Sequence, residues 1–380
     1  MEILEIIFWS SASILGLFYL GYYALCKHVV TSKTFDVKKD KNFRPKISIV
    51  IPTWNEENTI GGKLKNTLAL QYPKNKLEVI VIDSGSTDKT REIVKTFAKK
   101  SKRIKLIAEK ERRGKAYALN KAFKHSKGDI VIISDADCRL NKNILLKSVP
   151  YFHDHSVGAI TGRESIINPD ENIATKTEKT YRNFFYLIRG AESILDSTYV
   201  FDGPFSAFRR ELLSKIDSKT VADDSELALK IKKKGYRTLS IPEALYFEYA
   251  PSKLSQRTKQ KSRRAEGLTQ SMMNHFSTFF LNTEYGLFGL FIFPAGIFMH
   301  IISPFLLLAS IITLFFLPPS LLFVLLAIVL AGMLIPDVRR FILTFLHSQY
   351  ASLVGVLKYA TSAPDYRWKK IENTRRYGKC

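Results

Sequence analysis

A chain of 380 residues with a net charge of +23 can bury a sizeable core and favours an anionic partner. Its three cysteines are scattered and fit no metal spacing, which argues against a disulfide-built secreted domain. Charge alone leaves nucleic acid, an anionic membrane and an anionic substrate open. Hydropathy narrows the choice, because residues 6–26 carry no Asp, Glu, Lys or Arg over 21 positions and residues 285–336 carry none over 52. One membrane-spanning helix needs about 20 apolar residues, so the sequence predicts an integral membrane protein.

The apolar ends set the expected membrane layout. Residues 1–30 are predicted to form one retained transmembrane helix, because their leading end is acidic and lacks the basic region of a signal peptide. Residues 286–336 have room for two more, with a turn at Pro318-Pro319. Basic residues follow both apolar regions, so the positive-inside rule places the intervening domain in the cytoplasm. Residues 337–380 are predicted to form an interfacial helix and a basic cytosolic tail, because a further crossing would place that tail outside.

The middle of the chain, residues 45–250, alternates strand-like and helix-like patterns. Short apolar runs typical of buried strands are each followed by an amphipathic helical stretch. Such alternation predicts an α/β domain built on a mostly parallel, doubly wound sheet. The strands are expected within residues 46–54, 77–90, 103–110 and 129–137. Ligands of such sheets bind at the carboxyl ends of the strands, so polar residues at those ends are the candidates for a site.

Three aspartates occupy predicted strand ends. Asp135 and Asp137 are two residues apart on an extended chain, so their side chains share a face and repel unless a cation lies near. Such a pair suits Mg²⁺ or Mn²⁺ shared with substrate phosphates, although a solvated acidic turn is the simpler alternative. Asp83 could accept hydrogen bonds from a nucleobase or ribose, or it could merely belong to a capped turn.

Other segments offer further polar groups to the same edge, each with a structural alternative. "IPTWNEE" (51–57) has the same strand-to-helix layout and carries Asn55 and Glu56. "RRGKAYALN" (112–120) places cations around a glycine at a helix start, which is either an anion site or a solvated turn. Two acids open the helical stretch 221–238, where the helix dipole alone would favour them. Residues 251–285 are predicted to form basic interfacial helices, whose cations could bind anionic lipid or neutralise a diphosphate.

Taken in order, these segments resemble the membrane-bound family-2 glycosyltransferases. The segments are "IPTWNEE", "VIDSGSTD", "GKAYALN", "SDAD", "GPFSAFRRE", "ADDSELALKIKKKGYR" and "QKSRR". The chain is similar to the branch that holds cellulose, hyaluronan and poly-N-acetylglucosamine synthases, and to relatives that glycosylate lipids. The resemblance covers roughly residues 45–270. It implies a GT-A fold, inverting transfer of a hexosyl or N-acetylhexosaminyl group from a nucleotide-sugar, commonly a UDP-sugar, and Mn²⁺ or Mg²⁺ as cofactor.

The resemblance also implies roles for particular residues. Asp224 corresponds to the general base, Asp137 and Asp135 to the metal-binding acids, and Gly203, Pro204 and Asp223 to the acceptor side. The nucleotide-sugar would be bound by Pro52, Thr53, Asn55, Glu56, Asp83, Lys115, Asp135, Gln260, Arg263 and Arg264. The chain departs from the family where Arg264 replaces the Trp of the Gln-x-x-Arg-Trp motif and where Ala222-Asp223-Asp224 replaces Thr-Glu-Asp. The first departure concerns the acceptor, since that Trp helps to hold the acceptor sugar.

Three functions remain open from the sequence. A processive polysaccharide synthase fits the motifs, but a polymer channel needs more helices than predicted here, or a homo-oligomer. A single transfer onto a lipid or lipid-linked acceptor fits the small helix set. A non-catalytic protein that binds anionic lipid or nucleic acid fits the charge, but no basic strand interleaved with aromatics supports nucleic-acid binding.

Overall fold

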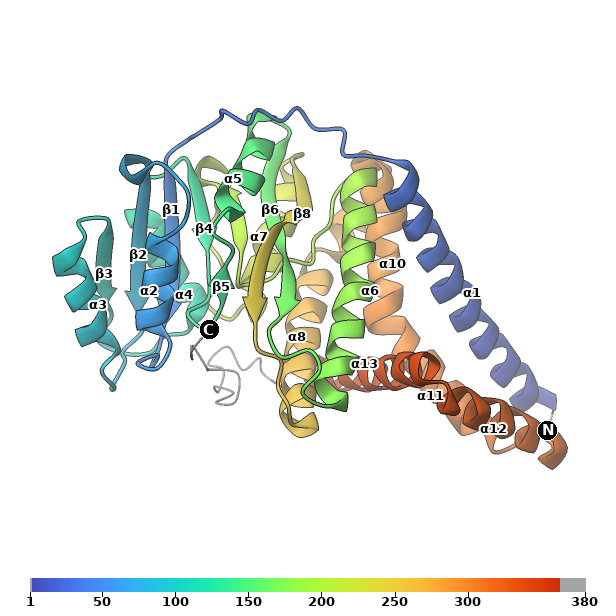
Figure 1. Ribbon diagram of the computed structural model, residues 1–380. Helices are drawn as coiled ribbons and strands as arrows, with labels where there is room; N and C mark the ends of the chain where they lie inside the picture. The colour runs from blue at the N-terminus through green and yellow to red at the C-terminus, as the bar shows by residue number, and fades with distance from the viewer. Residues whose placement is uncertain (1, 363–380) are drawn as a thin grey trace. The chain divides into compact units, whose positions relative to one another are not determined.

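The computed structural model describes residues 2–362 and divides into two compact units. The helical unit contains residues 2–33, 169–191 and 252–362. The sheet unit contains residues 34–168 and 192–251. The predicted basic tail beyond residue 362 lies outside the described residues. Figure 1 shows the helices and strands of both units.

The sheet unit is built on one mixed sheet whose described strands run in the order β3-β2-β1-β4-β7-β6-β8-β5. The strands are β1 (Ile47–Thr53), β2 (Leu77–Asp83), β3 (Ile104–Ala108), β4 (Ile130–Ile133), β5 (Arg139–Leu140), β6 (Val157–Ile166), β7 (Ser206–Arg209) and β8 (Arg237–Glu248). Strands β1, β2, β3 and β4 pair in parallel with one another, whereas β7 is antiparallel to both β4 and β6. The predicted α/β GT-A architecture is confirmed.

Helices connect the parallel strands and cover the sheet. They are α2 (Ile60–Leu68), α3 (Thr90–Lys100), α4 (Lys115–His125), α5 (Ile144–Ser148) and α7 (Asp223–Lys233), with 3-10 turns at Lys74–Lys76, Val149–His153 and Arg210–Leu212. Strands β1, β2 and β4 are almost wholly buried, which is why their sequences are continuous apolar runs. Their register sets Thr53 beside Asp83 and Val50 beside Ile133. The loops after β1, β2 and β4 therefore leave the sheet at one common edge.

The helical unit holds the apolar ends of the chain. Its helices are α1 (Glu2–Ser32), α6 (Ile173–Leu195, whose last turn belongs to the sheet unit), α8 (Leu254–Asn274), α9 (Phe276–Phe279), α10 (Phe293–Ile297), α11 (Ser303–Leu314), α12 (Pro319–Leu334) and α13 (Pro336–Thr361). A 3-10 turn at Thr283–Tyr285 and π-helical turns at Phe288–Ile292 and Phe298–Ile302 complete it. Within residues 2–362, Glu2–Ser32 and Phe288–Leu314 are each long and apolar enough to cross a membrane.

The second predicted span of 286–336 differs from expectation in length. Helix α12 has 16 residues, fewer than the roughly 20 that one crossing needs. It passes the test for a span only together with α13, from which it is bent by 115°. Pro336 at the start of α13 accounts for the break, because proline disfavours helical geometry in the residue before it.

Small and hydroxylated residues join the helices of this unit. Ser11 of α1 hydrogen-bonds Ser310 of α11 through their Oγ atoms at 2.6 Å. Helices α8 and α13 cross closely at Gly355, where an added Cβ would lie 2.5 Å from the Cβ of Ala265. Such contacts are typical of helices that associate in lipid, where small residues allow the backbones to approach.

Candidate active site

Asp83 ends β2 and is fully buried. Its carboxylate accepts hydrogen bonds from the backbone N–H of Ser86 at 3.1 Å and from the Ser86 hydroxyl, and it pairs with the Arg91 guanidinium. Both carboxylate oxygens thus hold the turn that follows β2. Asp83 therefore fixes the shape of the turn after β2, and its contact with the base stays a prediction.

The loop after β1 is tied to that same turn. Asn55 adopts a positive φ of 54°, its N–H donates to Ser86 Oγ at 2.8 Å, and its Oδ1 accepts from the Thr87 N–H at 2.8 Å. Glu56 is buried and accepts from the Thr59 hydroxyl at 2.7 Å, so it stabilises the start of α2. Thr53 is also buried, with Pro52 partly exposed beside it. These four predicted residues form the end of β1 and the loop that follows it.

A stacked pair that the sequence analysis did not single out lies next to this loop. The Arg112 guanidinium lies 3.6 Å from the centroid of the Trp54 ring, a cation–π contact. Gly85, at φ 72°, packs against the backbone of Arg112, where an added Cβ would lie 3.1 Å from the backbone nitrogen. The pair offers a flat surface at the end of β1. Trp54 within "IPTWNEE" and Arg112 within "RRGKAYALN" were visible in the sequence, but nothing there indicated that they touch.

The acids after β4 are supported by a buried lysine. Lys63 of α2 is fully buried and donates to Ser134 Oγ at 2.7 Å and to the Cys138 carbonyl at 3.2 Å. It therefore binds the residues on either side of the Asp135–Asp137 loop. Burial together with the Asp135 charge raises the pKa of Asp137 to about 6, and Lys63 opposes that rise. A lone lysine on the apolar face of "IGGKLKNTL" was the available signal for this residue.

Lys115, at the start of α4, joins two of the predicted acids. Its Nζ lies 3.1 Å from Asp135 Oδ1 and 3.5 Å from Asp223 Oδ2. These carboxylates hold the pKa of Lys115 above its usual range despite burial. Gly203 is packed against this pair, since a Cβ there would lie 2.6 Å from Asp135 Oδ2. The Pro204 carbonyl accepts from Ser134 Oγ at 2.6 Å, so the Gly203-Pro204 turn also shapes the acid loop.

Asp223 and Asp224 open helix α7 as predicted. Burial is the main cause that raises the pKa of Asp224 to about 8, and the charge of Asp223 adds to it. The pKa of Asp223 is also raised by burial, although Lys115 opposes this. Asp202 contributes a further negative charge and accepts from the Tyr246 hydroxyl at 2.9 Å. Asp224 is therefore a carboxylate of unusually high basicity in a cluster of acids.

Three predicted residues lie in the other unit. Gln260 and Arg263 are half-buried on α8, and Arg264 on the same helix is exposed. The sheet unit thus brings together Asp135, Lys115, Asp223, Asp224 and Gly203, while the α8 residues belong to the helical unit.

Asp135 and Asp137 suit a divalent cation that they share with the phosphates of a substrate. No group of three or more His, Cys, Asp or Glu side chains in residues 2–362 is arranged to hold a metal ion by itself. Asp135 and Asp137 supply two hard oxygen donors whose mutual repulsion a cation would relieve. Mg²⁺ and Mn²⁺ are commonly bound by one or two carboxylates together with substrate phosphates, so the residues present fit such a shared site.

The sequence model of "Glycosyl transferase family 2" matches residues 48–217, which contain the β1, β2 and β4 loops. A mannosyltransferase of Pyrobaculum calidifontis, solved in complex with GDP-Man and Mn²⁺, superposes with a TM-score of 0.81 at 30% identity. That similarity covers 94% of this chain and 99% of the mannosyltransferase. The chain belongs to glycosyltransferase family 2. The resemblance expected from the sequence motifs is confirmed, and sugar transfer is the activity of the family.

Curated relatives in family 2 differ in acceptor. The chain is 31% identical over 235 residues to a beta-monoglucosyldiacylglycerol synthase of Nostoc sp., covering 60% of this chain and 50% of that enzyme. It is 28% identical over 234 residues to a poly-beta-1,6-N-acetyl-D-glucosamine synthase of Staphylococcus aureus, covering 60% of this chain and 56% of that enzyme. The alignments span about half the length of these two relatives.

Proposed function

We propose that this family-2 glycosyltransferase moves one hexose from a nucleotide-sugar donor, with inversion, to a lipid-linked acceptor. The observation that carries the proposal is Asp224. It is a part-buried carboxyl at the start of α7 whose pKa is raised to about 8, beside the Lys115–Asp135 pair. A general base works best when its pKa lies near the working pH.

In the proposed reaction, Asp224 accepts the proton of the acceptor hydroxyl as its oxygen attacks the anomeric carbon. The bond to the nucleoside diphosphate breaks on the opposite face, which inverts the configuration. Lys115 fixes Asp135 in place, and Lys63 holds the loop that carries Asp137. Asp135 and Asp137 would hold Mn²⁺ or Mg²⁺, which supplies charge neutralisation for the diphosphate when bound. Arg263 is proposed to add positive charge for that leaving group.

Donor recognition is proposed for the edge formed by the β1 and β2 loops. The Trp54–Arg112 pair presents a flat face suited to stacking a base, and the turn fixed by Asp83 lies beside it in the sheet register. Both a UDP-sugar and a GDP-sugar fit this arrangement. The mannosyltransferase that this chain matches along nearly its whole length was solved with GDP-Man, so a GDP-sugar is the first donor to test.

A single transfer is favoured over polymer synthesis by the helix set. The match to the mannosyltransferase covers 99% of that protein, and a second relative is a glycolipid synthase. Polymer synthesis remains the second candidate, because the poly-N-acetylglucosamine synthase is also similar. The sheet unit is proposed to face the cytoplasm, since basic residues flank the apolar segments.

The test is a donor panel followed by sizing of the product. Purified full-length protein is incubated with GDP-mannose, UDP-glucose or UDP-N-acetylglucosamine and an extract of membrane lipids, and nucleoside diphosphate release is measured. The expected result is lipid-dependent release with one donor and an organic-soluble product that carries one sugar. A ladder of longer products would instead establish polymer synthesis.

A further inference from the structure

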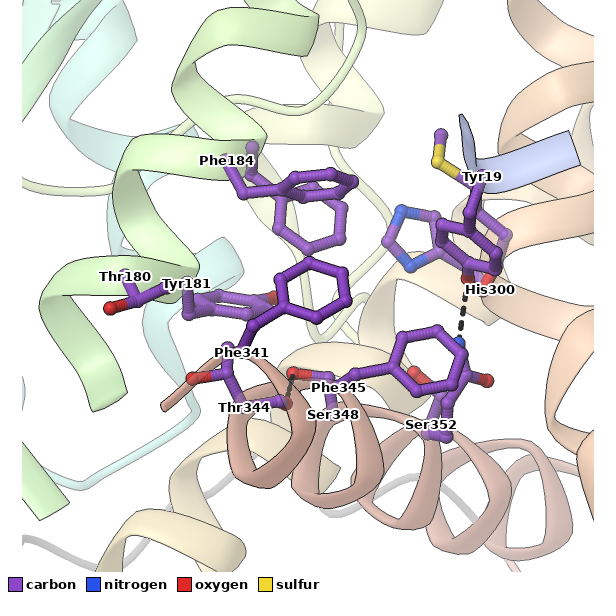
Figure 2. Close-up of a pocket in the computed structure, with 13 residues that line it drawn as sticks. Tyr19, Thr180, Tyr181, Phe184, His300, Phe341, Thr344, Phe345, Ser348 and Ser352 are labelled. Carbon is purple, nitrogen blue, oxygen red and sulfur yellow. Dashed lines mark hydrogen bonds between the residues drawn. The ribbon is translucent and has the colours of Figure 1, made fainter. Parts of the chain in front are cut away.

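The helical unit contains a pocket lined mainly by aromatic side chains (Figure 2). Its wall is formed by α1, α6, the π-helical turn Phe298–Ile302 and α13. The lining residues are Tyr19, Thr180, Tyr181, Phe184, Phe185, Met299, His300, Phe341, Thr344, Phe345, Ser348, Gln349 and Ser352. A mostly apolar pocket with a few polar groups is the usual form of a small-molecule site.

Two polar groups of this aromatic pocket, on Gln349 and Tyr19, satisfy each other. Gln349 Nε2 donates to the Tyr19 hydroxyl at 2.6 Å, as Figure 2 shows, and that hydroxyl also bonds Ser303 Oγ at 3.0 Å. The rings of Phe184, Phe341 and Phe345 face the space between these groups and Tyr181 (Figure 2). The interior therefore suits a hydrocarbon segment that brings no hydrogen-bonding group of its own.

A buried cluster of charges lies at the wall of the pocket. Glu178 of α6 accepts from Arg257 Nε at 2.7 Å and from Arg182 Nε at 2.8 Å, and Lys261 Nζ lies 3.4 Å from the same carboxylate. The side chains of Glu178, Arg257 and Lys261 are each at most 4% exposed. One carboxylate is thus shared among three cations.

Lys261 connects this cluster to the pocket. Its ammonium lies 3.4 Å from the centroid of the Tyr181 ring and 3.4 Å from Ser348 Oγ, and both residues line the pocket. Arg257 is one residue removed from it: Arg257 donates to the Thr177 hydroxyl, and the Thr177 carbonyl accepts from Thr344 of the pocket wall. The charged cluster and the aromatic pocket therefore form one continuous site.

Arg257 and Lys261 place two buried positive charges beside the single carboxylate of Glu178. Nη2 of Arg257 is buried and has no hydrogen-bond partner among the described residues. Burial is the main cause that lowers the pKa of Lys261 to about 7, and the neighbouring Arg257 and Arg182 lower it further. Burying a charge without full compensation costs several kcal/mol. An added anion would satisfy the free donor and balance the charge.

We propose that the helical unit binds a lipid phosphate, with its phosphate group at Arg257 and Lys261 and its hydrocarbon chain along the aromatic pocket. This inference deepens the proposed function by naming the acceptor class, and only the role as acceptor rests on that function. A phosphate offers several strong acceptor oxygens to an arginine and a lysine. A free inorganic anion would leave the adjoining aromatic pocket unused.

The test measures equilibrium binding of labelled farnesyl phosphate to the full-length protein in maltoside micelles, which contain no phosphate. Lys261→Met should weaken binding about tenfold, the worth of one hydrogen bond to a charged group, whereas Lys261→Arg should retain it. Lys259→Met on the same helix is the matched control, because Lys259 is exposed. Equal binding by wild type and Lys261→Met would overturn the proposal.

Further arms separate the parts of the ligand. Farnesol and inorganic phosphate should each compete at least about tenfold more weakly than farnesyl phosphate, since each lacks one half of the ligand. If farnesol competes equally well, the phosphate contributes nothing to binding, and if inorganic phosphate competes equally well, the hydrocarbon chain contributes nothing. Either result would overturn the proposal. Phosphatidylglycerol that displaces farnesyl phosphate at equal mole fraction supports the site and identifies a bilayer lipid as its natural source. Ser352→Phe, which fills the pocket, should reduce the preference for a chain-bearing phosphate.

Binding of the lipid does not depend on sugar transfer, so the two proposals fail separately. Thermal unfolding of Lys261→Met in micelles, compared with that of the Lys259→Met control, shows whether the variant is folded, and the control should keep donor turnover. Lipid binding without any donor turnover would overturn the proposed function alone. Donor turnover that is insensitive to Lys261→Met, together with unchanged lipid binding, would overturn this inference alone.

Discussion

The two units bury opposite imbalances of charge. In the sheet unit, Lys115 is shared by Asp135 and Asp223, with Asp224 beside them. In the helical unit, one carboxylate, Glu178, is shared by Arg257, Lys261 and Arg182. The carboxylates outnumber the lysine in the first cluster, and the cations outnumber the carboxylate in the second. Because buried charge is costly unless it is paired, each imbalance indicates the charge of a ligand.

The pKa shifts of the two clusters have the same origin and opposite sign. The pKa of Asp224 is raised to about 8 and that of Asp137 to about 6, because burial and neighbouring acids disfavour their ionised forms. The pKa of Lys261 is lowered to about 7, because burial and neighbouring arginines disfavour its charged form. In both clusters, burial and like charges therefore favour the neutral form of the ionisable group, and a ligand of opposite charge would favour the ionised form.

The largest effect is expected from Asp224→Asn, which removes the proposed base. Transfer should fall about 10²–10⁴-fold, the usual contribution of general-base catalysis, while donor binding remains. Nucleoside diphosphate release in the presence of acceptor measures this. The melting temperature at pH 8 should rise, because the folded protein no longer has to ionise a buried carboxyl. Stability of the wild type should correspondingly decline as pH rises from about 4 to about 8.

Retention of most activity by Asp224→Asn would contradict the assignment of the base. Asp217, an exposed aspartate that caps the backbone of Lys219, provides the matched control. Asp217→Asn should leave transfer unchanged. In the wild type, the rate at limiting acceptor should rise with pH until about 8, where Asp224 is ionised.

The next largest effect tests the helical unit. Glu178→Gln removes the carboxylate that pairs with Arg257 and Lys261 and leaves buried cations uncompensated. The free energy of unfolding should fall by about 3–5 kcal/mol, as for other broken buried pairs. Thermal unfolding in micelles provides the measurement. Farnesyl phosphate should recover part of the loss, and a variant as stable as wild type would show that the cluster is not short of negative charge.

A smaller effect is expected for the metal at the sheet unit. Adding Mn²⁺ should raise the melting temperature of the wild type, because a ligand that binds only the folded state stabilises it. Asp137→Asn should weaken this response about tenfold in Mn²⁺ concentration, within the range seen for perturbed metal sites. EDTA should abolish sugar transfer, and added Mn²⁺ or Mg²⁺ should restore it. Full transfer in EDTA would remove the metal from the proposed mechanism.

The first half of the sheet was predictable, whereas the second half was not. Strands β1, β2 and β4 are continuous apolar runs of local pattern, and each was expected. Strand β6 ends in the partly exposed "RESI", and β8 pairs with it across a long stretch of chain with two register shifts. Pairing of that kind depends on distant partners that no local period reveals. The mixed character of the sheet follows from β7, whose short sequence carries little signal of direction.

The site was predictable at its acids but not at its supports. Asp135, Asp137, Asp223 and Asp224 stand at element ends that the sequence pattern marks. Lys63, buried beneath the acid loop, and the Trp54–Arg112 stack depend on packing between elements far apart in sequence. Glu56 is buried and accepts a hydrogen bond from Thr59 of its own turn, a contact that the sequence pattern did not indicate, and its predicted role in donor binding stays a prediction. The Glu178 cluster escaped notice because α6 contributes its carboxylate about 80 residues before α8 contributes its cations.

The smallest predicted effect compares the two units by pH. The ratio of wild-type to Lys261→Arg affinity for farnesyl phosphate, in which the ionisation of the phosphate itself cancels, should fall about threefold between pH 6 and pH 8, because Lys261, with a pKa near 7, loses its proton. The other charged groups around it are Glu178, Arg182 and Arg257, with His347 of α13 nearby. His347→Gln should leave the midpoint in place, while Lys261→Arg should keep only the pH dependence that comes from ionisation of the phosphate. Sugar transfer should rise over the same interval through Asp224, so opposite slopes for lipid binding and for catalysis would trace each to its own unit, and parallel slopes would refute that division.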